Sequence, residues 1–161
     1  MTTNRGGRVA LAIHHSLKPT IGAIQGPAVG IGITMTLPMN VRIAHASSKI
    51  GFVFARRGLV MEACSSYFLP RLIGHSRAMQ AITTGSTYPA CHKVFDGLFA
   101  ETCEKSEDVL PTALRVAEDV VKNTSSVSTY LMKELMYRDK GSAEGQHLLD
   151  SRVIYELFGS P

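Results

Sequence analysis

The stretch "TIGAIQGPAVGIGITMTLPMN", Thr20 to Asn40, runs an aliphatic segment into a turn that contains three glycines. Its opening part, "TIGAIQ", is rich in β-branched residues and predicts a buried strand. Residues 31–37 predict a short helix, which Pro38 limits because proline cannot continue a helix. A strand that passes through a glycine-lined turn into a helix is typical of α/β proteins.

Outward from this stretch, strands are expected early in the chain and helices late. Pro19 ends an opening helix. Further strands are expected at residues 40–46 and 98–103, and further helices at residues 62–74, 75–85, 86–97, 106–123, 126–138 and 142–159. The pattern predicts a single α/β domain over residues 1–161, with its core in residues 8–104 and a helical region in residues 105–161.

The charge of the chain is divided unevenly along its length. The 161 residues carry a formal net charge of +4, but residues 1–61 hold seven Lys or Arg and no Asp or Glu. These cations are scattered, and no nucleic-acid motif accompanies them, so the pattern favours a phosphorylated ligand over nucleic acid or a membrane surface. No run approaches about 18 uncharged apolar residues, and so no membrane span is expected.

The glycine turn, residues 26–32, is the first candidate site. Its spacing, G-x-x-x-G-x-G, matches neither the dinucleotide-binding fingerprint nor a phosphate-binding loop with a following Gly-Lys-Ser/Thr. The glycines do allow backbone N–H groups to approach a ligand closely, with the positive end of the next helix aimed at an oxygen atom. The alternative interpretation is a tight turn that needs small residues only for packing.

Glu62 is the second candidate. It is the first carboxylate in the chain, and it follows the apolar segment "GLVM". Removing a carboxylate from water favours its protonated form, which is the condition for acting as a base and then as an acid near neutral pH. The alternative interpretation is a charge that only stabilises the start of the following helix.

No cofactor or metal site is expected. Cys64, Cys91 and Cys103 are odd in number and lack CxxC spacing, which argues against a disulfide framework or a zinc site and indicates a reducing compartment. No two histidines have the H-x-x-x-H spacing of zinc ligands.

Three segments together carry a family resemblance: "KPTIGAIQGPAVGIG", "RIAHASSKIGFVFARRGLVMEACSSYFLPRLIG" and "TTGSTYPACHKVFDGLFAET". They closely resemble the enoyl-CoA hydratase/isomerase (crotonase) superfamily, from Arg8 to the end of the chain. The combination of "GPAVGI" with "GLVMEACSSYFLP" looks most like the peroxisomal type of Δ3,Δ2-enoyl-CoA isomerase, and is similar to fungal members that include makers of polyketide or fatty-acyl toxins. The resemblance implies a crotonase-like α/β fold, an acyl-CoA thioester as substrate, no cofactor, and a homotrimer or hexamer.

The resemblance also assigns roles at the two candidate sites. In the family, the glycine turn supplies a backbone N–H to an enolate oxygen, and the matching donor here is Ile31, flanked by Gly30 and Gly32. Preorganised N–H groups stabilise negative charge where it develops. Glu62 falls where peroxisomal-type isomerases hold their single base, which takes a proton from C2 and returns it to C4.

Hydratases of the family resemble one another in holding two glutamates, and this chain has Thr34 and Phe54 at the matching positions. Phe54 is accordingly assigned to the substrate pocket. The resemblance therefore implies conversion of a 3-enoyl-CoA to the 2-enoyl-CoA, in β-oxidation or in the biosynthesis of a fatty-acyl or toxin side chain. Two alternatives stay open: an enoyl-CoA hydratase that uses Glu62 in an unusual way, and a noncatalytic binding or assembly subunit.

Relatives of this kind carry a further N-terminal segment that supplies the second oxyanion N–H, so the resemblance implies an N-terminally truncated, incomplete fold. We expect the 161 residues alone to isomerise slowly, to bind CoA weakly, and to be poorly soluble or oligomeric. The resemblance implies a peroxisomal location, although the sequence does not end in Ser-Lys-Leu; otherwise a mitochondrial or cytoplasmic location is expected.

Overall fold

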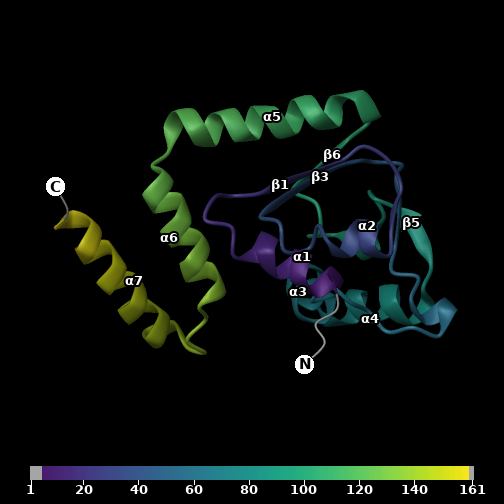
Figure 1. Ribbon diagram of the computed structural model, residues 1–161, viewed down its shortest axis with the longest axis horizontal. Helices are drawn as coiled ribbons and strands as arrows, with labels where there is room; N and C mark the ends of the chain where they lie inside the picture. The colour runs from purple at the N-terminus through teal and green to yellow at the C-terminus, as the bar shows by residue number, and fades with distance from the viewer. Residues whose placement is uncertain (1–4, 160–161) are drawn as a thin grey trace. The chain divides into compact units, whose positions relative to one another are not determined.

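The structure, a computed structural model, describes residues 5–159 of the chain (Figure 1). The chain divides into two compact units. Unit 1 comprises Met1–Ser16 and Thr20–Glu118, and unit 2 comprises Leu17–Pro19 and Asp119–Pro161. No helix among the described residues is long and apolar enough to cross a membrane.

A three-stranded parallel sheet forms the centre of unit 1. Its strands, in the order β1-β3-β6, are β1 (Ile21–Ile24), β3 (Val41–His45) and β6 (Glu101–Cys103). The first half of α5 (Ser106–Asn123) covers one face, where Val109 and Ala113 pack with Ile43. Ile43 and Val109 have no exposed surface, and burying such side chains contributes about 1.5–3 kcal/mol each. These strands and α5 confirm the elements expected at residues 20–25, 40–46, 98–103 and 106–123.

A second, mixed sheet carries the glycine turn. Its strands are β2 (Ala28–Val29), β4 (Lys49–Gly51) and β5 (Thr87–Pro89), with β2 and β4 parallel and β4 and β5 antiparallel. The short helix α2 (Ile31–Thr34) follows β2 after Gly30, and its chain continues as turns up to the predicted limit at Pro38. The N–H of Gly30 donates to the carbonyl oxygen of Gly51 at 3.0 Å, which attaches the turn to β4.

A buried arginine joins β3 to the turn after α2. Arg42 is only 5% exposed, and its Nε donates to the carbonyl oxygen of Leu98 at 2.7 Å. Its Nη1 donates to the carbonyl oxygens of Thr36 and Leu37, at 3.2 and 3.1 Å. The same Nη1 donates to the carbonyl oxygen of Met39. The guanidinium therefore holds several loop carbonyls in the interior, where an unpaired carbonyl is costly.

The other helices of unit 1 gather on the side of the sheet opposite the first half of α5 (Figure 1). They are α1 (Arg5–His14), α3 (Ser65–Ile73) and α4 (His75–Thr84), together with the 3₁₀ turns η1 (Ala55–Arg57) and η2 (Lys93–Phe95). Helices α3 and α4 confirm the two helices expected between residues 62 and 85, although α3 starts after Glu62 rather than at it.

The helix expected at residues 86–97 is wrong. Thr87–Pro89 form the edge strand β5, and the chain then makes only the short turn η2. Proline disfavours the helical conformation of the residue before it, here Tyr88, and it is tolerated in an edge strand. Pairing with β4 then favours a strand over a helix at these residues. The N–H of Ala90, directly after β5, donates at 2.9 Å to the carbonyl oxygen of Ser48, directly before β4.

In the described part of unit 2, the last residues of α5 are followed by the helices α6 (Ser126–Tyr137) and α7 (Ala143–Phe158), which confirm the last two expected helices. Each begins with a serine cap: the Ser125 and Ser142 hydroxyls accept from backbone N–H groups inside the helices. The helical C-terminal part of the chain was expected, and it forms as predicted.

Candidate active site

The glycine turn presents free backbone donors at the start of α2. Gly30 has a φ of 58° and a ψ of −125°, a conformation that residues with a side chain rarely adopt. The N–H groups of Ile33 and Thr34 donate to the carbonyl oxygen of Gly30. Within the described part of the chain, the N–H groups of Ile31 and Gly32 donate to no acceptor, as is usual in the first turn of a helix. These two adjacent donors are available to a ligand oxygen.

Glu62 lies between η1 and α3 in a tightly held turn. Ala63 and Cys64, which follow it, have φ values of 53° and 57°. A left-handed conformation costs an L residue about 1–2 kcal/mol, so neighbouring contacts must hold this turn. Ser65, which is fully buried, donates from both its N–H and its hydroxyl to the carbonyl oxygen of Glu62. The turn thus fixes the backbone of a half-buried glutamate.

The Glu62 carboxylate meets both α2 and α1. The hydroxyl of Thr34, a residue with no exposed surface, donates to Oε1 at 2.6 Å. The other oxygen, Oε2, fills the space that a Cβ atom on Gly6 would occupy. The Cδ1 atom of Ile31 lies 3.3 Å from that same position. Helices α1 and α2, which are both far from Glu62 in the sequence, therefore converge on its carboxylate.

The structure brings together the two principal residues predicted from the sequence. Ile31, which is half exposed, and Glu62 both border Gly6. Phe54 lies at the start of η1 with a half-buried side chain, and its carbonyl oxygen accepts from the N–H groups of Arg57 and Leu59. The roles of these residues as donor, base and pocket wall stay predictions.

Sequence reasoning missed two residues of the site. The sequence predicts no role for Thr34 beyond its standing at a position where family hydratases hold a glutamate. Gly6 is not among the predicted site residues. The one available signal for Gly6 is the pair Gly6-Gly7 inside α1, because a glycine within a helix costs roughly 0.5–1 kcal/mol relative to alanine. Nothing local in the sequence shows that a carboxylate occupies the space beside it.

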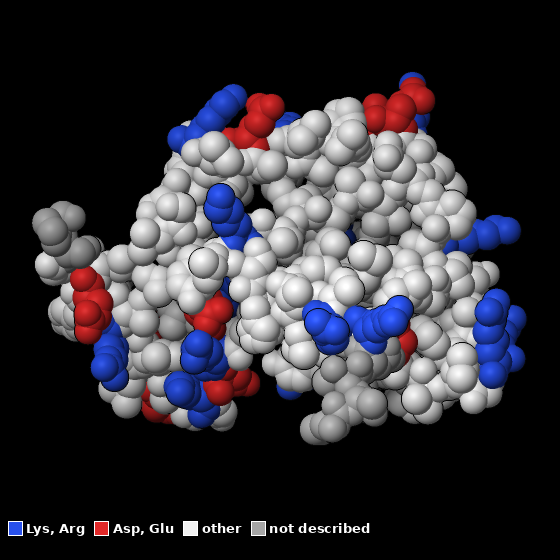
Figure 2. Space-filling model, viewed as in Figure 1, with Lys and Arg blue, Asp and Glu red and all other residues white. Residues whose placement is uncertain are grey.

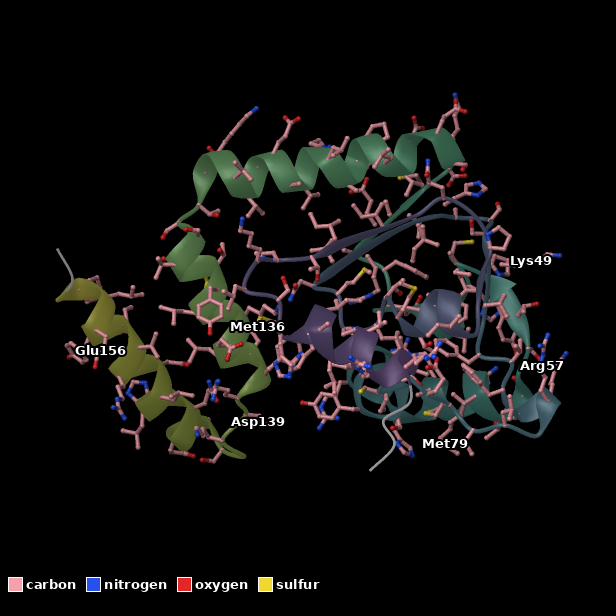
Figure 3. All side chains as sticks on the ribbon, viewed as in Figure 1. Lys49, Arg57, Met79, Met136, Asp139 and Glu156 are labelled. Atoms are coloured by element: carbon pink, nitrogen blue, oxygen red, sulfur yellow. The ribbon has the colours of Figure 1, made fainter. Side chains whose placement is uncertain are left out.

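Basic side chains lie on the surface of unit 1. In the view of Figure 2, blue side chains lie over α1 and along the edge at η1, where red ones are few. Lys49 and Arg57 point outward from that edge, and both are exposed (Figure 3). Arg56 donates from Nε to the carbonyl oxygen of Thr84 at 2.9 Å and from Nη2 to the hydroxyl of Ser86 at 2.8 Å. Surface cations of this kind raise the local concentration of anionic ligands.

Comparison with known proteins identifies the family. Residues 4–160 match the family described as Enoyl-CoA hydratase/isomerase. The chain belongs to the enoyl-CoA hydratase/isomerase family. It is 53% identical over 155 residues to "Enoyl-CoA hydratase ACTT3" and 52% identical over 155 residues to "Enoyl-CoA hydratase AFT3-1", both of Alternaria alternata. These matches cover 96% of this chain and 52% of each relative, so the chain spans about half the length of the curated relatives it matches.

Solved structures of the family share the fold. A probable enoyl-CoA hydratase/isomerase from Mycobacterium abscessus matches with a TM-score of 0.89 and 29% identity, covering 96% of this chain and 61% of that chain. A monofunctional enoyl CoA isomerase from M. smegmatis matches with a TM-score of 0.77 and 31% identity, covering 88% of this chain and 67% of that chain. The expected α/β crotonase fold is confirmed, with C-terminal helices, and it is partial relative to these members of the enoyl-CoA hydratase/isomerase family.

Proposed function

We propose that the protein is an enoyl-CoA isomerase, which converts a 3-enoyl-CoA thioester to the 2-enoyl-CoA with Glu62 as its single acid/base. The observation that carries the proposal is the half-buried Glu62 carboxylate, held by Thr34 beside the helix that follows the glycine turn. By the family resemblance, Thr34 and Phe54 match the positions of the two glutamates that family hydratases hold. A reaction that needs only one carboxylate fits this site.

Isomerisation needs one base because the proton leaves C2 and returns to C4. Glu62 takes the proton from C2, and the electron pair of the C2–H bond passes into the thioester carbonyl to form an enolate conjugated with the C3–C4 double bond. The protonated Glu62 then gives its proton to C4, and the double bond forms between C2 and C3. The N–H of Ile31, donating to the enolate oxygen, stabilises the charge of the intermediate.

Replacing Glu62 tests this function directly. We expect Glu62→Gln to lower kcat for a 3-enoyl-CoA by at least about a hundredfold, the scale of general acid/base catalysis, with little change in thermal stability. Glu104→Gln is the control, because Glu104 is an exposed carboxylate of the same unit that lies between β6 and α5. Isomerisation by Glu62→Gln at the wild-type rate would overturn the proposal.

Hydration of a 2-enoyl-CoA is the second candidate, favoured by the name enoyl-CoA hydratase that the relatives from Alternaria alternata carry. The two reactions are separated by giving the purified protein a 3-enoyl-CoA and, separately, crotonyl-CoA. Isomerisation without hydration supports Glu62 as a lone acid/base. Efficient hydration that Glu62→Gln abolishes would instead assign Glu62 to the activation of water. Binding of both thioesters without turnover would favour the noncatalytic alternative.

We also propose that the protein assembles as a homotrimer or hexamer. The support from the structure is a set of large apolar side chains that the helices of unit 2 leave exposed. They are Met136 (84% exposed), Leu148 (71%), Tyr155 (75%) and Phe158 (78%). Such surfaces commonly mark contacts between proteins. Light scattering tests the proposal, and a monomer at micromolar concentration contradicts it.

A peroxisomal location and a role in β-oxidation or toxin biosynthesis are proposals that rest on the family resemblance.

A further inference from the structure

We propose that Gly6 and Thr34 form a two-sided clamp that positions the Glu62 carboxylate, so that α1 is part of the acid/base site. The inference rests on the proposed role of Glu62 and adds to it the two residues that orient this group. Neither Gly6 nor Thr34 exchanges a proton with the substrate, and both act through Glu62 as positioning residues.

Thr34 holds one side of the carboxylate. In the 2.6 Å contact the Thr34 hydroxyl is the donor and Oε1 of Glu62 is the acceptor. Thr34 has no exposed surface, and its hydroxyl is therefore shielded from competing water. Thr34 also ends the short helix that begins at Ile31. The same helix therefore carries the proposed oxyanion donor and the group that orients the base, which fixes the base relative to the donor.

Gly6 holds the other side. A Cβ atom on Gly6 would overlap Oε2 of Glu62 and would lie 3.1 Å from its Cδ, so the carboxylate packs directly against the backbone of α1. The neighbouring Gly7 differs, because a Cβ atom there would have nothing within 4 Å. Only one of two adjacent glycines is therefore required by the site.

This difference gives a matched pair of variants. Alanine is the better helix former at both positions, so neither Gly6→Ala nor Gly7→Ala weakens α1 through helix propensity. The atoms that Gly6→Ala displaces belong to the end of a flexible side chain, and the clash is relieved by movement of the carboxylate rather than by unfolding. A second pair tests the hydroxyl: Thr34→Val removes it while keeping the shape of the side chain, and Thr34→Ser restores it.

The kinetic experiment measures kcat and KM for a 3-enoyl-CoA in all four variants, with a thermal melt of each. We expect Gly6→Ala and Thr34→Val to lower kcat by about tenfold to a hundredfold with little change in KM, since misplacing a reacting group by about 1 Å can cost about a hundredfold. Gly7→Ala should match the wild type, and Thr34→Ser should regain most of the activity that Thr34→Val loses. Wild-type kcat in both Gly6→Ala and Thr34→Val overturns the clamp but leaves the Glu62→Gln result, and with it the proposed function, intact.

Crystal structures of the variants give a readout that does not depend on turnover. A displaced Glu62 carboxylate in Gly6→Ala and Thr34→Val, and an unchanged one in Gly7→Ala, supports the clamp even if the protein catalyses neither isomerisation nor hydration. An unmoved carboxylate in Gly6→Ala and Thr34→Val overturns the clamp whatever the kinetics show.

Discussion

Replacing Arg42 by methionine tests whether one buried guanidinium stabilises unit 1. The variant keeps an apolar side chain of similar length but removes the donor to the carbonyl oxygens of Leu98, Leu37 and Met39, whereas the carbonyl oxygen of Thr36 keeps the N–H of Met39. Each buried carbonyl left without a partner costs about 1–3 kcal/mol. Part of this cost is offset because methionine does not carry the several kcal/mol that it takes to bury a cation. We expect a net loss of about 3–5 kcal/mol in the free energy of unfolding, because three unpaired carbonyls together cost about 3–9 kcal/mol and the removal of the buried cation offsets several kcal/mol of that cost.

Urea unfolding followed by circular dichroism measures this loss. With a slope of about 2 kcal/mol per molar urea, a loss of about 4 kcal/mol lowers the midpoint by about 2 M. Arg115→Met is the control, because Arg115 makes only a 3.4 Å ion pair with Glu101 and the two side chains are 70% and 47% exposed. Such surface pairs contribute about 0–1 kcal/mol. Equal midpoints for Arg42→Met and Arg115→Met would refute the reasoning.

Two further stability changes follow from local geometry. Gly97→Ala is expected to lower the free energy of unfolding by more than about 2 kcal/mol, because φ is 91° and a Cβ atom would lie 2.7 Å from the carbonyl oxygen of Leu72. Gly141→Ala is the control: its φ is 73° but a Cβ atom would have nothing within 4 Å, so the loss should be only about 1–2 kcal/mol. Equal losses in the two variants would contradict the argument. Ser142→Ala removes the hydroxyl that accepts from the N–H of Gly145 at 3.0 Å, and should destabilise α7 by about 1 kcal/mol; unchanged helicity and stability would show that this cap contributes nothing.

The two longer strands of the first sheet could be predicted from the sequence, and the edge strand of the second sheet could not. Strand β1 is an aliphatic run and β3 alternates apolar and polar residues, and Pro19 and Pro38 precede the two strands. The second sheet is made of strands of two or three residues, which are shorter than any periodicity. At Thr87–Pro89 the local signals of a helix start and of an edge strand coincide, and only the distant partner Lys49–Gly51 decides between them.

Part of the candidate site could likewise be predicted from the sequence, and part of it could not. Ile31 and Glu62 could be singled out because a glycine-lined turn and an isolated carboxylate are visible in short stretches of sequence. The contacts of Glu62 with Gly6 and Thr34 join residues from separate elements, and the Thr34 contact spans 28 positions. No local pattern encodes which side chain fills the space beside a helical glycine, so only the folded chain shows these contacts.

Residue 34 is one of the two positions, with residue 54, at which the resemblance separates the two proposed reactions. A glutamate there would add a second carboxylate to the surroundings of Glu62, and two carboxylates at close range do not both ionise readily. A threonine adds no charge and instead donates a hydrogen bond to Oε1, which leaves Glu62 as one oriented carboxylate. Relative to the hydratase pattern that the resemblance implies, residue 34 therefore changes from a carboxylate to a neutral hydrogen-bond donor. A neutral donor at this position suits the proposed reaction, in which a single carboxylate both removes and returns the proton.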